Sequence, residues 1–443
     1  MSNSGVIAAV ASPPGVGAVS LVRLSGQGVF EVASRMLRRF QFDEFQARKA
    51  FRDDVIADDG APIDDVVVVC YRNPSSYTGE DVVEVSGHGG IHVTRRVLER
   101  ALECGARLAD AGEFSLRAFL NGKLDLTQAE AVMDLISAQT DLAARAAKEQ
   151  LSGSLGDAVT VVREEIINLA AHVEAYIDFP EEDISPETGE ALENSFRKLE
   201  DSLGGLLGTA KRGRLLREGA RVAIVGAPNA GKSSLLNALL GYDRALVSEE
   251  AGTTRDTVEE VLDFGGFPVR LIDTAGLRDA GGEIEKKGMA RARQRMEDSD
   301  LILELVDGSQ EVTTRLTENS LLVLNKGDLG EHQSWQGEQA VRVSVLQEKG
   351  LDELREEVAT RLGGEGRENS GGALIAINAR HQDCLRRAES ALAEARQMLA
   401  SGEEPEFVSL PLREALQAVG EVAGRIDSDE ILGSIFSQFC IGK

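Results

Sequence analysis

The segment at residues 226–233, Gly-Ala-Pro-Asn-Ala-Gly-Lys-Ser, constrains the fold of this chain more than any other feature. It has the glycine and lysine spacing of a phosphate-binding loop. The apolar run Val222–Val225 before it predicts a buried strand, and the run Ser234–Leu240 after it predicts a helix that ends at Gly241. A strand, a glycine loop and a helix in this order direct backbone N–H groups at an anion. The sequence therefore predicts an α/β domain that binds a nucleoside triphosphate.

Polar residues in and after this loop predict how phosphates and a metal ion are held. Lys232 supplies a positive charge for the β- and γ-phosphates, and the Ser233 hydroxyl suits Mg²⁺. A second hydroxyl, that of Thr254, can complete the metal shell. Asp273 follows an apolar run that predicts a strand and suits a place next to Mg²⁺, and the Gly276 N–H can contact the γ-phosphate.

The run Asn325–Asp328, which follows the strand-like Leu321–Leu324, predicts the contact with the base. A carboxylate at Asp328 can accept hydrogen bonds from N1–H and the 2-amino group of guanine, and adenine offers neither donor there. Sites built on such bonds reject the wrong partner by about 10⁴ or more. The last base-contacting loop, Ser344–Leu346, departs from the usual Ser-Ala, which leaves the role of Ser344 less secure. In this order and spacing the motifs indicate a Ras-like GTPase domain with a mostly parallel sheet. The predicted GTP contacts are Asn229, Ala230, Gly231, Lys232, Ser233, Ser234, Ser248, Glu249, Glu250, Ala251, Gly252, Thr253, Thr254, Asp273, Thr274, Ala275, Gly276, Asn325, Lys326, Asp328 and Ser344.

Asp273-Thr274-Ala275-Gly276 forms a DxxG motif, and the next residue is Leu277. Ras-like GTPases place a water-orienting glutamine at that position. No side chain between Asp273 and Leu277 can perform that task. The following polar run contains Glu283 and Glu285, and spacing alone neither chooses between them nor distinguishes a catalytic residue from a solvated loop. A polar group outside the motif is therefore expected to orient the water.

Composition limits the partners and the compartment. A formal net charge of −26 makes the chain a poor general polyanion binder, because it repels RNA unless a basic patch or a partner is recruited. No apolar run approaches the ~20 residues of a membrane span, and the N-terminus has no basic start, which favours a cytoplasmic protein. The four cysteines lie far apart in the sequence and form no CxxC pair, and no disulfide is expected in a reducing compartment. Cys70 is predicted to be a core thiol.

The chain is predicted to contain an α+β region (1–120), a helical region (121–212), the GTPase domain (213–370) and a second helical region (371–443). In the first region, strands are predicted at Ile7–Val10, Val19–Leu24, Val66–Cys70 and Val82–Val85, and a helix at Ile91–Cys104. Apolar residues near the helix period predict helices at Leu126–Ala143, Val159–Ile177, Leu385–Leu399, Leu412–Val422 and Ile431–Phe439. Because helical stretches flank the GTPase domain, we expect that domain to be inserted into one helical domain with its ends close together.

Over essentially its whole length the chain resembles the MnmE (TrmE) family of tRNA-modification GTPases. The resemblance rests on the GTPase motifs and on residues 13–15, 23–26, 77–81, 87–90, 112–115, 117–126 and 439–443. The final run, Phe439–Lys443, is the most diagnostic, because other GTPases do not end in this way. The resemblance implies an N-terminal domain that binds folate and mediates dimerisation.

The resemblance also implies a potassium ion beside the nucleotide, in place of an arginine finger. Its ligands map to the Asn229 side chain, Ser248, the backbone of Glu250, and Thr253. A monovalent cation in this position neutralises charge that develops in the transition state. The family's catalytic glutamate maps to Glu285.

In the N-terminal domain the resemblance implies a tetrahydrofolate that carries a formyl or methylene group. Its contacts map to Arg23, Glu80, Lys123 and Lys443. Glu80 can accept hydrogen bonds from a pterin edge, and basic residues suit the glutamate tail. Cys440 is the candidate catalytic thiol. The alternative is that Cys440 is only packed near the folate and takes no part in catalysis.

Family resemblance finally implies a homodimer that works with the flavoprotein MnmG, which carries FAD. Together they would install an aminomethyl-type group on carbon 5 of the wobble uridine of certain tRNAs. One alternative is a GTP-controlled ribosome-assembly or RNA-binding switch without synthetic chemistry, which would share the GTPase domain. Another is a folate-dependent aminomethyltransferase acting alone, which would leave the GTPase unused.

Overall fold

In a computed structural model, contacts divide the chain into two units. One unit comprises residues 1–133 and 420–443, and the other comprises residues 134–419. The residues that the structure describes are 5–41, 46–178, 190–246, 261–273, 297–311, 320–363, 374–401, 405–424, 429–437, 439 and 441–442.

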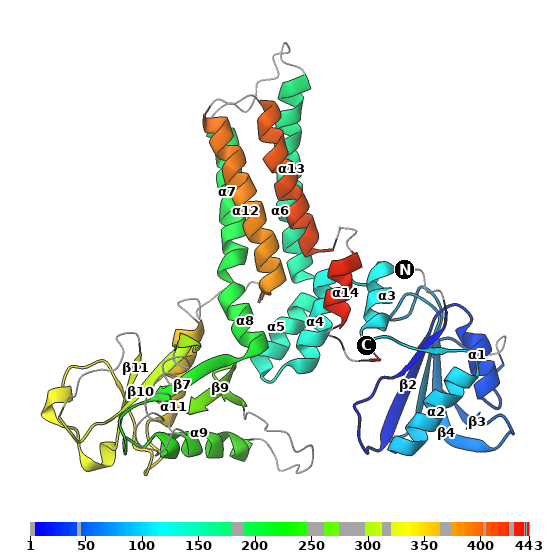
Figure 1. The fold of residues 1–443 in the computed structure, drawn as a ribbon, viewed down its shortest axis with the longest axis horizontal. Coiled ribbons are helices and arrows are strands. Elements are labelled where there is room, and N and C mark those ends of the chain that lie inside the picture. The colour runs from blue at the N-terminus through cyan, green and yellow to red at the C-terminus, as the bar shows by residue number, and fades with distance from the viewer. Residues whose placement is uncertain are drawn as a thin grey trace, which may run out of the picture. The chain divides into compact units, whose positions relative to one another are not determined.

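A six-stranded sheet with the order β3-β4-β5-β2-β1-β6 forms the centre of the first unit (Figure 1). Neighbouring strands are antiparallel except β1 and β6. Buried and exposed residues alternate along β4, so one sheet face packs against helices α1 and α2. The strands are β1 (Ile7–Val10), β2 (Val19–Ser25), β3 (Phe51–Ile56), β4 (Pro62–Tyr71), β5 (Val82–His88) and β6 (Arg107–Leu108), and the helices are α1 (Val29–Met36) and α2 (Ile91–Glu103).

The predicted strands of this region are confirmed as β1, β2, β4 and β5, and the predicted helix is α2. Cys70 is fully buried in β4, and burial raises its pKa to about 12, so the prediction of a core thiol is confirmed. Strands β3 and β6 and helix α1 were not predicted.

The C-terminal segment packs within the same unit. Helix α14 (Asp429–Ser437) contacts α3 (Glu113–Leu120), and Phe436 lies 5.3 Å from Phe439, centroid to centroid. Ile441 forms an isolated β-bridge with Ala111. At Gly442, with φ of +101°, a Cβ would lie 2.3 Å from the Val10 carbonyl oxygen. The chain therefore passes close to the end of β1 just before its last residue.

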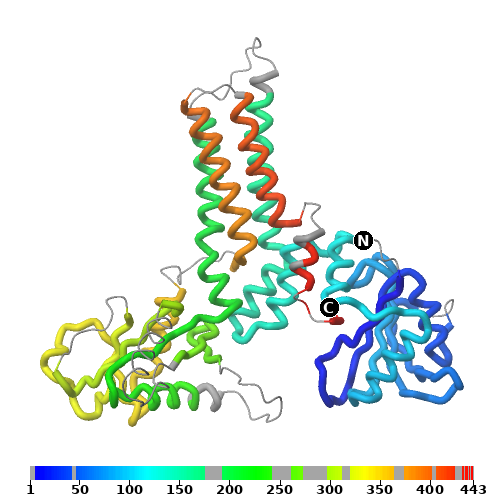
Figure 2. The backbone as a smooth tube through the Cα atoms, in the orientation of Figure 1, coloured from blue at the N-terminus to red at the C-terminus, as the bar shows by residue number. Residues whose placement is uncertain are grey.

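Helices α6, α7, α12 and α13 run side by side as a bundle in the second unit (Figure 2). Arg396 of α12 is paired with Glu193 and, at 2.7 Å, with Glu200 of α7. Arg413 of α13 lies 2.7 Å from Glu174 of α6. The helix bounds are α6 (Ser154–Asp178), α7 (Glu190–Gly208), α12 (Ala379–Ala400) and α13 (Pro405–Val422).

The helical pattern predicted from Leu126 to Ala143 is confirmed, and the structure divides it between two helices. These are α4 (Leu126–Ser137) and α5 (Asp141–Leu151). Thr140 caps α5 by accepting a hydrogen bond of 3.2 Å from the Ala143 amide. Helix α8 (Ala210–Glu218) follows the bundle helix α7.

The second sheet, also in this unit, has the order β12-β11-β10-β7-β9-β8 and is parallel except for β8. Its strands are β7 (Ala220–Val225), β8 (Val261–Phe264), β9 (Phe267–Asp273), β10 (Leu301–Asp307), β11 (Leu321–Asn325) and β12 (Val341–Arg342). Helices α9 (Lys232–Leu246) and α11 (Leu351–Gly363) contribute to its core. Helix α9 continues through Gly241, so its predicted end is wrong. A glycine inside an exposed helix costs only about 1 kcal/mol and does not by itself stop it.

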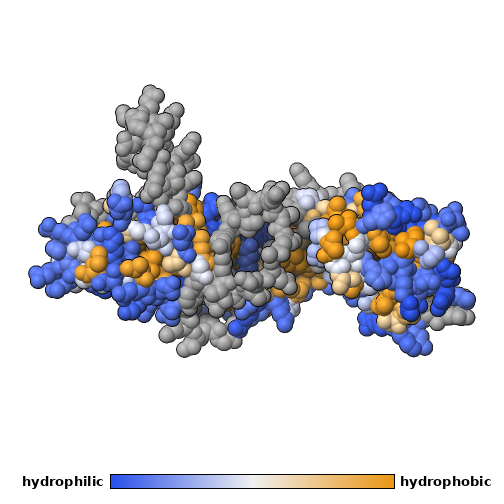
Figure 3. All heavy atoms as spheres, turned by 90° about the horizontal axis from the view of Figure 1, so that it is seen from below, coloured by the Kyte–Doolittle hydropathy of each residue, from blue (hydrophilic) through white to orange (hydrophobic). Residues whose placement is uncertain are grey.

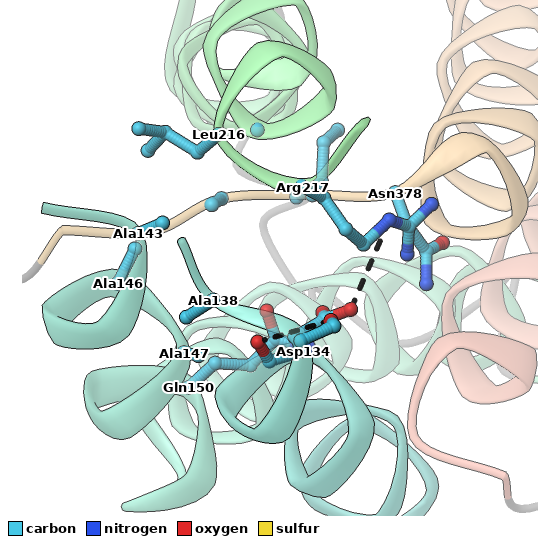
Figure 4. A pocket seen from close by; sticks show the side chains of 13 residues that line it. Asp134, Ala138, Ala143, Ala146, Ala147, Gln150, Leu216, Arg217 and Asn378 are labelled. Carbon is cyan, nitrogen blue, oxygen red and sulfur yellow. Dashed lines mark hydrogen bonds and ion pairs between the residues drawn. The ribbon is translucent and has the colours of Figure 1, made fainter. Parts of the chain in front are cut away.

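Where the chain enters and leaves this sheet region, its two segments are in contact. At Gly213 of α8, a Cβ would lie 2.5 Å from the carbonyl oxygen of Ile377. Figure 4 shows the small-residue pocket beside this contact, lined by alanines of α5 and crossed by an Arg217–Asp134 ion pair of 3.9 Å. The segment before α12 therefore packs against α8.

The β8–β9 turn is fixed to helix α5. The Thr140 hydroxyl donates to the Gly266 carbonyl at 2.6 Å. Gly266 has φ of +93°, and a Cβ there would lie 2.7 Å from Leu142 Cβ.

We expect Gly266→Ala to lower the free energy of unfolding by about 2 kcal/mol, from backbone strain and overlap with Leu142. The thermal midpoint of the purified protein measures this effect. Gly241→Ala is the control, because its Cβ meets nothing within 4 Å, and an equal loss there would contradict the account.

Among the residues coloured in Figure 3, hydrophilic ones surround separate hydrophobic patches. None of the helices in the described part of the chain combines the length and the apolar character that crossing a membrane requires.

Candidate nucleotide site

The phosphate-binding loop lies between β7 and α9, and its glycines are required by close contacts. At Gly226, with φ of +154°, a Cβ would lie 2.1 Å from the Leu305 carbonyl oxygen. At Gly231 a Cβ would lie 2.3 Å from Asn325 Nδ2. The Lys232 ammonium donates to two carbonyls of the loop, at 2.8 Å each, so its charge is held at the loop itself. This arrangement suits an anionic phosphate chain.

Asn325 joins the phosphate-binding loop to the loop predicted to contact the base. Its side-chain amide donates to the Ala230 carbonyl at 2.9 Å, and its oxygen accepts from the Val345 amide at 3.3 Å. The Ser344 hydroxyl donates to Asp328 Oδ1 at 2.6 Å. The structure therefore brings Ser344 to the predicted guanine-reading carboxylate, although this loop departs from the usual Ser-Ala.

Asp307, which the sequence analysis did not single out, contacts the same loops. It ends β10 and is the register partner of Asn325. Lys326 Nζ lies 2.6 Å from its Oδ2, and the Ser309 hydroxyl donates to its Oδ1 at 2.6 Å. Burial alone would raise the pKa of the Asp307 carboxyl, but hydrogen bonds from Lys326 and Ser309 outweigh it and lower that pKa. The signal that could have found Asp307 is its place at the carboxyl end of a parallel strand, where ligands bind in open α/β sheets.

Strand β9, which leads into the predicted Asp273–Gly276 motif, ends at the same edge of the sheet. Asp273, the last residue of β9, pairs in register with Ile224, two residues before Gly226. Its backbone is therefore next to the start of the phosphate-binding loop. Many predicted site residues lie outside the described residues, namely Ser248, Glu249, Glu250, Ala251, Gly252, Thr253, Thr254, Thr274, Ala275, Gly276, Glu285, Cys440 and Lys443.

A second candidate site lies in the first unit, in a pocket lined by Tyr77, Glu84 and Lys123 among others. Arg23 forms an ion pair of 2.8 Å with Glu84, and its guanidinium lies 5.4 Å from the centroid of the Tyr77 ring. The structure thus brings Lys123 to the pocket and Arg23 to two of the pocket's lining residues. Sequence reasoning missed Glu84. Its neighbours Val83 and Val85 in β5 are buried, so the alternation along the strand places Glu84 on the sheet face opposite to theirs.

Glu80 belongs to a neighbouring hydrogen-bond network rather than to the lining of this pocket. Its Oε2 accepts from the Ser25 hydroxyl at 2.8 Å and from Arg117 at 2.9 Å. Arg117 is also paired with Glu113 at 2.9 Å. The carboxylate of Glu80 therefore already has two donors from the chain itself.

His88 provides a pH-dependent contact in the first unit. Its Nδ1 lies 2.7 Å from Asp64 Oδ1, and this hydrogen bond, with the charge of Asp64, raises the pKa of His88 above its usual value. The contact stabilises the fold fully below the unfolded-state pKa near 6.5 and is lost as the pH rises through the folded-state pKa. We expect an NMR titration to show His88 titrating above the usual range, and Asp64→Asn to return it there. An unchanged pKa in that variant would contradict the assignment.

Comparisons with known proteins agree with this geometry. The family model described as the GTP-binding protein TrmE N-terminus matches residues 6–123, and the MnmE helical domain model matches residues 126–440. The tRNA modification GTPase MnmE of Akkermansia muciniphila is 46% identical over 445 residues, covering 99% of this chain and 98% of the relative. The chain belongs to the MnmE family. The resemblance stated from the sequence is thereby confirmed, and this MnmE-family protein is a GTP hydrolase.

Further comparisons extend over different lengths of the chain. MnmE of Aquifex aeolicus is 44% identical over 449 residues, covering 99% of both chains. Among solved structures, the G domain of the T. maritima FeoB iron transporter is 26% identical with a TM-score of 0.23, covering 32% of this chain and 98% of that one. The predicted fold class is confirmed: an α+β N-terminal region, a helical region and a P-loop GTPase region with a mostly parallel sheet.

Proposed function

We propose that this MnmE-family protein uses GTP hydrolysis to modify carbon 5 of the wobble uridine of certain tRNAs with an aminomethyl-type group. The observation that carries the proposal is family membership over 99% of the chain, shared with relatives named tRNA modification GTPase. The preorganised nucleotide loops support it, because Asn325 bonds to Ala230 of the phosphate-binding loop at 2.9 Å and to Val345 of the predicted base-contacting loop at 3.3 Å. Ser233 and Thr254 would hold Mg²⁺, with Asp273 beside it.

A potassium ion would act beside the nucleotide, bound by Asn229, Ser248, Glu250 and Thr253. Asn229 has φ of +64°, a left-handed backbone conformation that asparagine adopts more readily than most residues. We expect GTP turnover to be much faster in K⁺ than in Na⁺ at equal ionic strength, because a fitted cation offsets transition-state charge. Phosphate release measures this, and equal rates in the two salts would remove the cation from the mechanism.

Folate chemistry would use the N-terminal domain. Arg23, Glu80, Lys123 and Lys443 are the proposed contacts of a tetrahydrofolate that carries a formyl or methylene group. The contact of Gly442 with the Val10 carbonyl supports including the C-terminus, because Val10 pairs with Val22 next to Arg23. When bound, the folate would supply the one-carbon unit, and the protein would hold its pterin and glutamate ends. Cys440 would act as a thiol near this unit.

The proposed domains are residues 1–120 for folate binding and dimerisation, 121–212 with 371–443 for the helical domain, and 213–370 for the inserted GTPase domain. We propose a cytoplasmic homodimer that forms a complex with an MnmG-type flavoprotein, which supplies FAD. The contact between Gly213 and Ile377 supports the insertion, because entry and exit segments meet there.

Affinity purification of the full chain tests the partner. The proposal expects a flavin-coloured protein and tRNA to co-purify with it. Ribosomal subunits in their place would support the alternative of a ribosome-assembly switch and contradict the synthetic role.

A further inference from the structure

The predicted roles of the GTPase motifs do not account for an ion pair between Asp307 and Lys326 in the nucleotide region. Its atoms are 2.6 Å apart, and the Asp307 and Lys326 side chains are 13% and 32% exposed. The other carboxylate oxygen of Asp307 accepts from the Ser309 hydroxyl at 2.6 Å and the Ser309 amide at 3.1 Å. Asp307 is therefore fixed independently of Lys326.

Lys326 has a backbone conformation that needs support. Its φ of +65° and ψ of 35° lie in the left-handed region, which a long L side chain rarely adopts. The turn starts at Asn325, which is bound to Ala230, and leads to Asp328, which is bound to Ser344. A change in the backbone conformation of Lys326 would therefore displace the Asp328 carboxylate, which is predicted to read guanine.

We propose that Asp307 is a positioning residue for guanine-nucleotide binding. It holds the Lys326 ammonium, and through it the left-handed turn, so that Asp328 is in place before the nucleotide arrives. A loop that is ordered beforehand loses less freedom on binding. The ion pair also neutralises a carboxylate near an anionic ligand, which lessens repulsion.

Asp307→Asn tests the proposal, because it removes the charge and keeps the shape. The dissociation constant of a fluorescent GDP analogue is measured with the full chain, together with KM and kcat for GTP. We expect about a tenfold loss of affinity, the size expected for a hydrogen bond between charged groups. KM should rise by a similar factor while kcat stays unchanged. A fall in kcat with unchanged KM would overturn the proposal.

A double-mutant cycle with Lys326→Met separates positioning from a general structural effect. If Asp307 acts through Lys326, Asp307→Asn adds less than a twofold loss in the Lys326→Met background. An undiminished tenfold loss in that background would overturn the proposal. If the Asp307→Asn variant does not fold, the affinity of Ser309→Ala for the GDP analogue tests the proposal instead. This change removes one hydrogen bond to Asp307 Oδ1 and leaves both members of the ion pair in place. A loss of about threefold supports the proposal, and wild-type affinity contradicts it. All these measurements concern GDP or GTP alone and are independent of tRNA chemistry.

Discussion

Asp328→Asn is expected to change the preferred base of this protein from guanine to xanthine. An aspartate accepts from N1–H and from the 2-amino group of guanine. An asparagine can still accept from N1–H, but its amide N–H₂ faces the 2-amino group of guanine, where two donors meet. Xanthine carries a carbonyl at that position and pairs with the amide. Sites of this kind discriminate by about 10⁴ or more, so we expect a loss of GTP affinity of that order.

Nucleotide competition against a fluorescent GDP analogue measures this change directly. The Ser344 hydroxyl, 2.6 Å from Asp328 Oδ1 in the structure, can bond equally to the amide oxygen, so the loop should keep its shape. Asp352→Asn is the matched control, since Asp352 is exposed in the first turn of α11. If the Asp328→Asn variant still prefers GTP to xanthosine triphosphate, Asp328 does not read the base.

Glu285→Ala is expected to keep GTP affinity and lose turnover by about 10² to 10⁴, the usual contribution of a positioned acid–base group. Family resemblance assigns the water-orienting role to Glu285, and Leu277 leaves the motif itself without a side chain for that task. Single-turnover phosphate release gives the rate, and nucleotide titration gives the affinity. Glu283→Ala provides a matched control two residues away. Full activity in Glu285→Ala with loss in Glu283→Ala would move the role to Glu283.

The elements around the phosphate-binding loop could be predicted because the local pattern and the tertiary environment agree there. The β-branched run before the loop forms β7, and the run before Asn325 forms β11. Both strands are buried in a parallel sheet, where apolar runs are uninterrupted.

Strand β3 could not be predicted, because its pattern includes Asp53 and Asp54. Asp53 is 2% exposed, and its carboxylate accepts hydrogen bonds from the Arg39 and Asp54 amides. A buried aspartate with backbone partners resembles a surface residue in the sequence, and only the fold reveals the partners. The break between α4 and α5 had a signal in Thr140, but a continuous apolar period on both sides concealed it.

The candidate sites likewise contain some residues that the sequence predicted and some that it missed. Motif residues such as Asn325 and Ser344 were predicted from spacing, and in the structure they contact other motifs. Asp307 and Glu84 were missed, because their contacts depend on strand register and cross-strand pairs: Asn325 is the register partner of Asp307, and Arg23 is paired with Glu84. Register between distant strands is not encoded in any short run of sequence.

The central claim is that guanine-nucleotide turnover by this protein drives wobble-uridine modification, and mass spectrometry of tRNA nucleosides tests it most directly. Cells that lack the chain, cells complemented with it, and cells complemented with Lys232→Ala are compared. The account predicts that carbon-5-substituted wobble uridines disappear without the chain, return with the wild-type protein and stay absent with Lys232→Ala. Unchanged levels of these nucleosides in cells without the chain would contradict it.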